Sequence, residues 1–214
     1  MGIEQVIVIA ALILSIVLHE VAHGYAANWL GDPTAKLQGR LSLNPIKHID
    51  PLGSVILPAA LFLMNAGILF GWAKPVPYNP YNLRDRRWGE AIVAAAGPAT
   101  NMLLAVIFAG LIRFSDALSL SSSMLELFSY IVYINILLAL FNMIPLPPLD
   151  GSKILGALLP GSLGMQYREL TVRLEQYGLL FTFLFLFLFI QVFSGPFGIA
   201  VSAIFEMLTG LRGF

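Results

Sequence analysis

Residues 19–23 read HEVAH and combine two metal-binding side chains with a carboxylate. Positions four apart lie on one face of a helix, so His19 and His23 can direct imidazole nitrogens at one zinc ion, with Glu20 beside it as a general base. So short a motif also arises by chance, and helix-packing histidines are the alternative. Here the motif lies inside a long apolar segment, where ionisable side chains are costly and mark functional sites. We therefore predict a metal centre on this segment.

A catalytic zinc ion needs a third protein ligand and one open position. The residues that follow His23, GYAANWLGDP, contain neither the glutamate nor the third histidine of soluble zinc proteases. Asp150 in NMIPLPPLDG is the best remaining candidate, because the number of crossings brings it to the face where the first helix ends. Asp150-Gly151 is also a common turn or helix cap, and that alternative stays open. His48 is interpreted as a solvated loop residue, since a fourth ligand would close the site.

The composition is typical of a chain whose main solvent is lipid. Of the 214 residues, 58% are apolar and only 11% are charged, about half the charge of a soluble domain. The 12 basic and 12 acidic residues cancel, which excludes the basic surface needed for nucleic acid. With no cysteine, disulfides and thiolate metal sites are excluded as well, so a metal must be held by His, Asp or Glu.

Apolar segments of this length predict an all-α polytopic membrane protein with about five transmembrane helices. The expected spans are 4–30, 88–114, 124–144, 177–193 and 196–211. The last two are separated by Ser194-Gly195-Pro196 and are predicted to form a tight helical hairpin at about 177–212. Between them and the third span we expect a short helix after Gly151 and an interfacial helix at about 166–176. The chain is interpreted as one domain, 1–214, with its motifs at about 4–151.

The stretch 52–72 is apolar enough to span, but Pro58 lies inside it and Asn65-Ala66-Gly67 favours a turn. Lys and Arg collect in cytoplasmic loops, and a re-entrant stretch, with a β-like form as an alternative, best preserves that bias. Only Arg113 then lies on the far side. The residues predicted to share the cytoplasmic side are Lys36, Arg40, Lys47, Lys74, Arg84, Arg86, Arg87, Lys153, Arg168, Arg173 and Arg212.

Three motifs in this order resemble the site-2 protease family of intramembrane zinc metalloproteases. They are HEVAH, GPATN at 97–101, and the segment 142–151 that ends in LDG. The resemblance covers about 18–151 and implies that His19, His23 and Asp150 bind one Zn²⁺ per chain. The sequence lacks the PDZ and CBS domains of many members, so it is similar to the minimal class.

The resemblance also implies roles for the residues around the metal. Glu20 corresponds to the catalytic glutamate, which takes a proton from water and passes it to the leaving amine. Asn142, Pro145 and Pro148 correspond to residues that engage the substrate, and Asn101 to a residue near the cleft; Asn142 or Asn101 could also stabilise the oxyanion. An exposed edge in the re-entrant stretch or at 71–76 is a hypothesis for capturing an extended substrate.

The expected function is a membrane-embedded HExxH zinc endopeptidase that cuts in or next to transmembrane segments of membrane proteins, as in regulated intramembrane proteolysis. The alternatives are a membrane metal transporter or sensor that uses the same ligands, and an inactive relative that binds partner helices. Expected partners are transmembrane substrates and the bilayer, with no nucleic acid. The expected location is a prokaryotic plasma membrane, with the active site near the cytoplasmic side.

Overall fold

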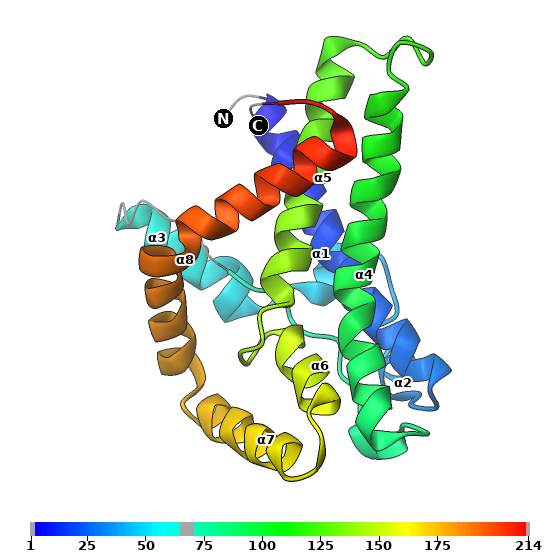
Figure 1. Cartoon of the computed structure of the whole chain (residues 1–214). Helices are drawn as coiled ribbons and strands as arrows, with labels where there is room; N and C mark the ends of the chain where they lie inside the picture. The colour runs from blue at the N-terminus through cyan, green and yellow to red at the C-terminus, as the bar shows by residue number, and fades with distance from the viewer. Residues whose placement is uncertain (1–2, 65–70, 213–214) are drawn as a thin grey trace.

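The computed structural model describes residues 3–64 and 71–212, which form helices and loops and, within those ranges, no β-strand (Figure 1). This confirms the predicted all-α class. The elements are α1 (Ile3–Trp29), α2 (Thr34–Leu37), η1 (Pro45–His48), η2 (Pro51–Ile56), α3 (Leu57–Leu63), η3 (Pro80–Asn82), α4 (Arg86–Arg113), α5 (Ser122–Asn142), α6 (Asp150–Leu158), α7 (Gly161–Gln176) and α8 (Gly178–Thr209).

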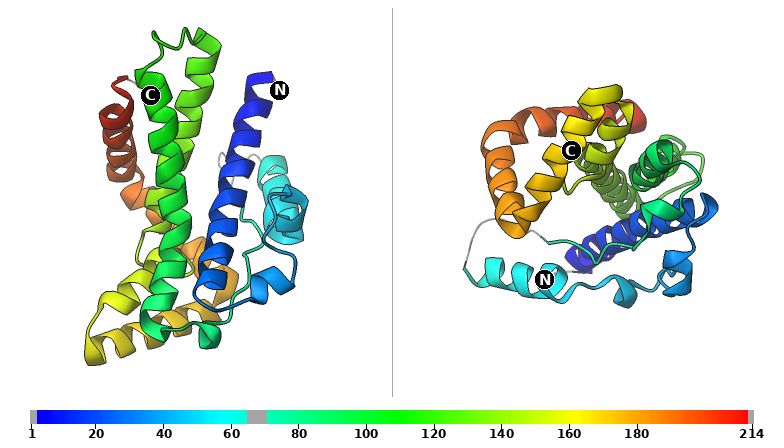
Figure 2. Two further views of the ribbon diagram at one scale, coloured as in Figure 1. Left: turned by 90° about the vertical axis from the view of Figure 1, so that its right-hand side faces the viewer. Right: turned by 90° about the horizontal axis from the view of Figure 1, so that it is seen from below.

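Among the described residues, α1, α4, α5 and α8 are long and apolar enough to cross a membrane. Helix α4 contacts the other three and also α6, and Figure 2 shows α1, α4 and α5 running side by side. Ala105 and Ala109 of α4 pack with Val132 and Ile136 of α5 and with Phe205 of α8 in the largest buried cluster. The alanines let the helix backbones approach closely, which fixes α4 as the central support of the fold.

The predicted C-terminal hairpin is a single helix in the structure. Helix α8 is helical throughout Gly178–Thr209, with Pro196 inside it, and it changes direction midway without reversing (Figure 1). The proline removes one backbone hydrogen bond and its ring displaces the preceding turn, which bends a helix. A reversal would require non-helical residues, and this part of the chain has none. In place of the predicted tight hairpin the structure has one bent helix, and the described residues contain four candidate spans where the sequence predicted about five.

The C-terminal end of α8 lies beside the C-terminal end of α4. The Arg113 guanidinium donates to the carbonyl oxygens of Leu208 and Met207 at 2.6 and 2.7 Å. Arg212 comes soon after the end of α8, so it lies at the same end of the fold as Arg113. The sequence had predicted that it lies with the other basic residues. The remaining Lys and Arg residues keep the asymmetry that orients the chain.

The two ends of the stretch 52–72 are hydrogen-bonded to each other, which is the arrangement that a re-entrant segment requires. The Trp72 N–H donates to the Gly53 carbonyl at 3.2 Å, and the Ser54 hydroxyl donates to the Trp72 carbonyl at 2.8 Å. The described part is helical rather than β-like, with 6 residues in η2 and 7 in α3, too few to span. The turn expected at Asn65-Ala66-Gly67 lies outside the described residues.

Residues 71–79 carry the chain from this segment across α1 without regular secondary structure. Prolines at 75 and 77 favour an extended backbone. The fully buried Asp32 accepts hydrogen bonds from the Asn79 N–H at 2.6 Å, from the Asn82 amide at 2.8 Å and from the Thr34 hydroxyl at 2.6 Å. This carboxylate therefore fixes the far end of the crossing segment beside the C-terminal end of α1.

Candidate metal centre

Helix α1 presents His19 and His23 on one face, towards α4. Their side chains are buried, and the two Nε2 atoms lie 3.0 Å apart. Gly97 of α4 makes room for the pair, because a Cβ added there would lie 2.5 Å from His23 Nε2 and 2.6 Å from His19 Nε2. The spacing of the histidines follows from the helix, and their depth against α4 follows from this glycine.

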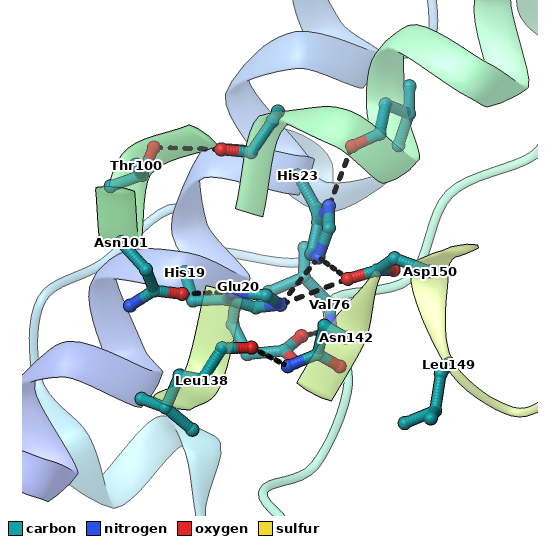
Figure 3. Close-up of polar contacts among 12 residues, drawn as sticks. His19, Glu20, His23, Val76, Thr100, Asn101, Leu138, Asn142, Leu149 and Asp150 are labelled. Atoms are coloured by element: carbon teal, nitrogen blue, oxygen red, sulfur yellow. Dashed lines mark hydrogen bonds and ion pairs between the residues drawn. The ribbon is translucent and has the colours of Figure 1, made fainter. Parts of the chain in front are cut away.

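Asp150 reaches the histidines from the first residue of α6. Its Oδ2 lies 3.2 Å from His19 Nε2 and 3.3 Å from His23 Nε2, and Figure 3 shows the three side chains converging. Gly151 permits the preceding turn, since a Cβ there would lie 2.2 Å from the Met143 carbonyl oxygen. Asp150 is therefore at once the start of a helix and part of a cluster with the two histidines, so the turn or cap alternative does not exclude a ligand role.

The three ligand atoms have the spacing of a zinc site. Ligand atoms about 2.0–2.1 Å from a tetrahedral zinc ion are about 3.3 Å from one another. The observed edges of 3.0, 3.2 and 3.3 Å match one face of such a tetrahedron. Two imidazoles and one carboxylate are also a donor set that zinc accepts, and three protein ligands leave the fourth position open. The residues present therefore fit the metal.

Hydrogen bonds fix the histidine tautomers. His23 Nδ1 lies 2.6 Å from the Val93 carbonyl oxygen, which can only accept, so Nδ1 carries the proton and Nε2 presents its lone pair. His19 Nδ1 lies 2.5 Å from Asn101 Oδ1 in the same arrangement. Helix α4 thus supplies both partners that turn the ring nitrogens towards the centre.

Asn101 lies beneath His19 and is fully buried. Its amide donates to the Ser15 carbonyl at 3.3 Å and to Asn135 Oδ1 at 2.8 Å, while the Asn135 amide donates to the Ser15 hydroxyl at 2.9 Å. The oxygen and the amide nitrogen of Asn101 are thus both engaged by residues of the fold. The geometry makes Asn101 a positioning residue for His19 and does not favour the direct substrate or oxyanion contact considered from the sequence.

Glu20 borders a cavity of ≈ 130 Å³ that the metal triad also lines. Its Oε2 accepts a hydrogen bond from the Val76 N–H at 2.9 Å, which leaves Oε1 as the oxygen able to take a proton. The cavity therefore brings the carboxylates of Glu20 and Asp150 together beside the two histidines.

Asn142 and Pro148 line the same cavity, and Pro145 does not. The Asn142 amide donates one N–H to the Leu138 carbonyl at 2.9 Å and retains a second N–H and its oxygen. Pro145 is exposed, and its carbonyl accepts the Tyr167 hydroxyl at 2.7 Å. The structure thus separates the substrate-binding candidates into two that face the cavity and one that braces α7.

His48 is buried rather than solvated, which corrects the interpretation from the sequence. Its Nε2 lies 2.8 Å from the Ser42 carbonyl oxygen, within the loop that also bonds Lys74. It contributes to no metal group among the described residues. Loop packing explains its burial.

Several residues that shape the metal centre and its cavity were not identified from the sequence. Val93 and Val76 act through backbone atoms, which side-chain motifs do not reveal. Gly97 was noted as part of a motif, but its closeness to the histidines depends on how α4 packs against α1. Tyr78 and Lys153 also line the cavity. The position of Lys153 one turn after Asp150 was a signal that could have identified it.

Comparison with known proteins identifies the family. The family model for peptidase family M50 matches residues 109–189. A candidate zinc metalloprotease of Bacillus subtilis, YwhC, is 39% identical over 178 residues, which cover 80% of this chain and 76% of that protein. Rip2 of Mycolicibacterium smegmatis, likewise named a candidate zinc metalloprotease, is 32% identical over 178 residues, covering 82% of this chain and 64% of Rip2.

A third relative, MJ0611 of Methanocaldococcus jannaschii, carries the same kind of name and is 43% identical over 90 residues, 41% of this chain and 46% of that protein. No solved structure matches significantly. These relatives are named as zinc metalloproteases. Zinc is also the metal that fits the ligand atoms of His19, His23 and Asp150. The chain belongs to peptidase family M50, the site-2 protease family.

Proposed function

We propose that this protein is an intramembrane zinc endopeptidase of the HExxH type. Its substrates are membrane proteins, cut in or next to their transmembrane segments, as in regulated intramembrane proteolysis. The observation that carries the proposal is the triad of His19, His23 and Asp150 with zinc-like spacing, beside Glu20 and a cavity, at the end of an apolar helix. Family membership supports the same activity.

The roles of the residues follow from their contacts. His19 Nε2, His23 Nε2 and Asp150 Oδ2 would hold the metal. When bound, zinc supplies a Lewis acid that polarises the scissile carbonyl and makes water more acidic. Glu20 takes a proton from water on Oε1 and returns it to the leaving nitrogen, while Val76 holds Oε2 and thereby fixes the carboxylate.

Asn142 is placed to bind the substrate backbone. Because Leu138 uses only one N–H of its amide, the other N–H and the oxygen can pair with a peptide group in the cavity. Pro148 borders the same space and cannot compete as a donor. A helical substrate must unwind here, since its peptide groups are otherwise engaged in its own hydrogen bonds.

Addition of the substrate as a strand along residues 71–76 is not supported. The N–H groups of Trp72, Lys74 and Val76 are already used by Gly53, His48 and Glu20. The residues between them that would face outward include Pro75, which has no N–H, and Arg40 occupies the Lys74 and Pro75 carbonyls at 2.8 and 3.3 Å. This edge has too few free donors for a ladder of backbone hydrogen bonds.

We place the site near the cytoplasmic side of a prokaryotic plasma membrane. The end of α1 that carries the histidines leads directly into the loop with Lys36, Arg40 and Lys47, which is the end expected inside. The relatives found by comparison come from bacteria and an archaeon.

A metal transporter using the same ligands would need successive sites along a path. Within residues 3–64 and 71–212, the histidine and aspartate triad is the one group placed to hold a metal. This favours hydrolysis over transport. An inactive relative that only binds helices would not need Glu20 held beside the triad.

The deciding experiment incubates detergent-solubilised protein with a panel of single-span substrates. We expect Glu20→Gln to keep about one zinc per chain and to lose cleavage about 100- to 10,000-fold. Glu169→Gln on the exposed face of α7 is the matched control and should cleave normally. Cleavage by Glu20→Gln at the wild-type rate, with normal membrane insertion, would refute the proposal.

A further inference from the structure

Lys153 brings a positive charge into the cavity of the metal centre. It lies on α6 one turn after Asp150 and lines the cavity together with Glu20 and the histidines. Among the described residues it forms no salt bridge. A half-buried ammonium is costly unless neighbouring groups or a ligand stabilise its charge, and this one has no carboxylate within salt-bridge distance among those residues.

Tyr78 faces Lys153 from the crossing segment. The Lys153 Nζ lies 5.4 Å from the centre of the Tyr78 ring, and both side chains border the same cavity. Burial raises the pKa of Tyr78, so its phenol keeps the proton and can donate. Burial alone would lower the pKa of Lys153, but the negative charge of Asp150 and the hydrogen bond with Tyr78 outweigh it and raise that pKa, so the ammonium stays charged.

The sum of the charges around the cavity indicates what Lys153 could bind. The Glu20 and Asp150 carboxylates together balance a doubly charged metal ion, so a loaded site without Lys153 would be neutral. With Lys153 the site carries one net positive charge inside a poorly solvated cavity. Such a site favours a ligand that has gained one negative charge over the neutral peptide from which it forms.

The other nearby donors are less suited to that task. Asn101 is fully buried beneath His19 and uses its amide on Ser15 and Asn135. Asn142 has one neutral N–H remaining. Neither brings charge to the cavity.

We propose that Lys153, assisted by Tyr78, is a catalytic residue that binds the carbonyl oxygen of the scissile peptide as that oxygen becomes negative. This rests on the proposed protease function. As the C–O bond forms from water, the carbonyl electron pair moves onto the oxygen, where the Lys153 ammonium and the Tyr78 hydroxyl donate. When the C–N bond breaks, the pair returns to the carbonyl and Glu20 delivers its proton to the nitrogen.

The test compares Lys153→Met, Lys153→Arg and Tyr78→Phe with the wild type. Lys36→Met, which removes an exposed lysine on α2, is the control. We expect Lys153→Met to lower kcat about 100-fold with KM changed by less than about 3-fold, because the contact is made in the transition state. Tyr78→Phe should show a smaller loss of the same kind, and Lys153→Arg should recover part of kcat.

Two further measurements separate catalysis from structure. Zinc content and Tm should match the wild type in every variant. A phosphinate peptide, whose anionic tetrahedral centre resembles the transition state, should bind Lys153→Met about 100-fold more weakly, while the corresponding substrate peptide binds equally well. Loss of zinc or of Tm in Lys153→Met would overturn the proposal, because the lysine would then be structural.

Unchanged kcat and unchanged phosphinate binding in Lys153→Met would also overturn it. The proposed function is tested separately by Glu20→Gln. If the wild type cleaves no substrate, the protease function fails, and the phosphinate measurement still decides whether Lys153 binds an anion in this cavity.

Discussion

The α1–α4 contact and helix α8 differ in the side chains that they bury. At the α1–α4 contact, Ser15, His19, His23 and Asn101 are buried and hydrogen-bonded to one another or to the backbone. On α8 the buried residues are mainly apolar, and phenylalanines four apart along 181–193 contact one another through their rings. Because unpaired polar groups are costly in lipid, each polar contact on α1 specifies a partner and a distance. Before its packed end at Val201 and Phe205, helix α8 requires mainly apolar surface, so this part should tolerate far more change.

Removing the aspartate of the triad should have the largest effect on zinc binding and cleavage. Asp150→Ala leaves two histidines, too few protein ligands for a stable zinc site. We expect zinc to fall well below one per chain and cleavage to be lost. Metal analysis and a substrate-panel assay measure this, with the exposed Asp116→Ala as control. Full zinc content in Asp150→Ala would remove Asp150 from the ligand set.

A methyl group at two glycines tests the contrast directly. Gly97→Ala would place a carbon within 2.6 Å of both histidines, so we expect loss of zinc and a destabilisation of about 1–3 kcal/mol. Gly195→Ala on α8 meets nothing within 4 Å and should keep zinc, activity and Tm. Thermal unfolding with and without added zinc compares the two. Equal behaviour would show that the α1–α4 contact is looser than the distances indicate.

The hydrogen bond beneath His19 should have an intermediate effect. Asn101→Ala leaves His19 Nδ1 without its partner, and we expect zinc affinity to fall about 10- to 100-fold. Asn142→Ala faces the cavity instead and should keep zinc while weakening cleavage. Competition with a zinc chelator gives both affinities. A larger zinc loss in Asn142→Ala would reverse the assigned roles.

The smallest expected effect concerns the loop that closes the site. Burial alone would raise the pKa of Asp32, but hydrogen bonds from Thr34, Asn82 and Asn79 outweigh it and lower that pKa. The stability this carboxylate contributes is therefore complete above its ordinary pKa of about 3.9 and is lost as the pH falls below that value. Tm measured from about pH 7 to pH 3 should fall by more in the wild type than in Asp32→Asn. Parallel curves would contradict this.

Local patterns predicted several elements well. The HEVAH spacing predicted two histidines on one face of a helix, because helix geometry is local. The positions of α1, α4, α5, α6 and α7 followed from apolar length and from proline and glycine signals. The C-terminal hairpin failed because a proline at position 196 predicts equally a turn or a kink, and packing of α8 on α4 and α5 decides between them.

By itself the sequence determined the membrane setting, the all-helical class, the histidine pair and the glutamate, since these depend on composition and on residues within one helical turn. It also named Asp150 as a candidate. Only the tertiary structure decided that Asp150 meets the histidines, that Asn101 supports His19 and that Lys153 shares the cavity. Those contacts join residues far apart in the chain, and their distances are set by how closely α4 packs against α1 and α6.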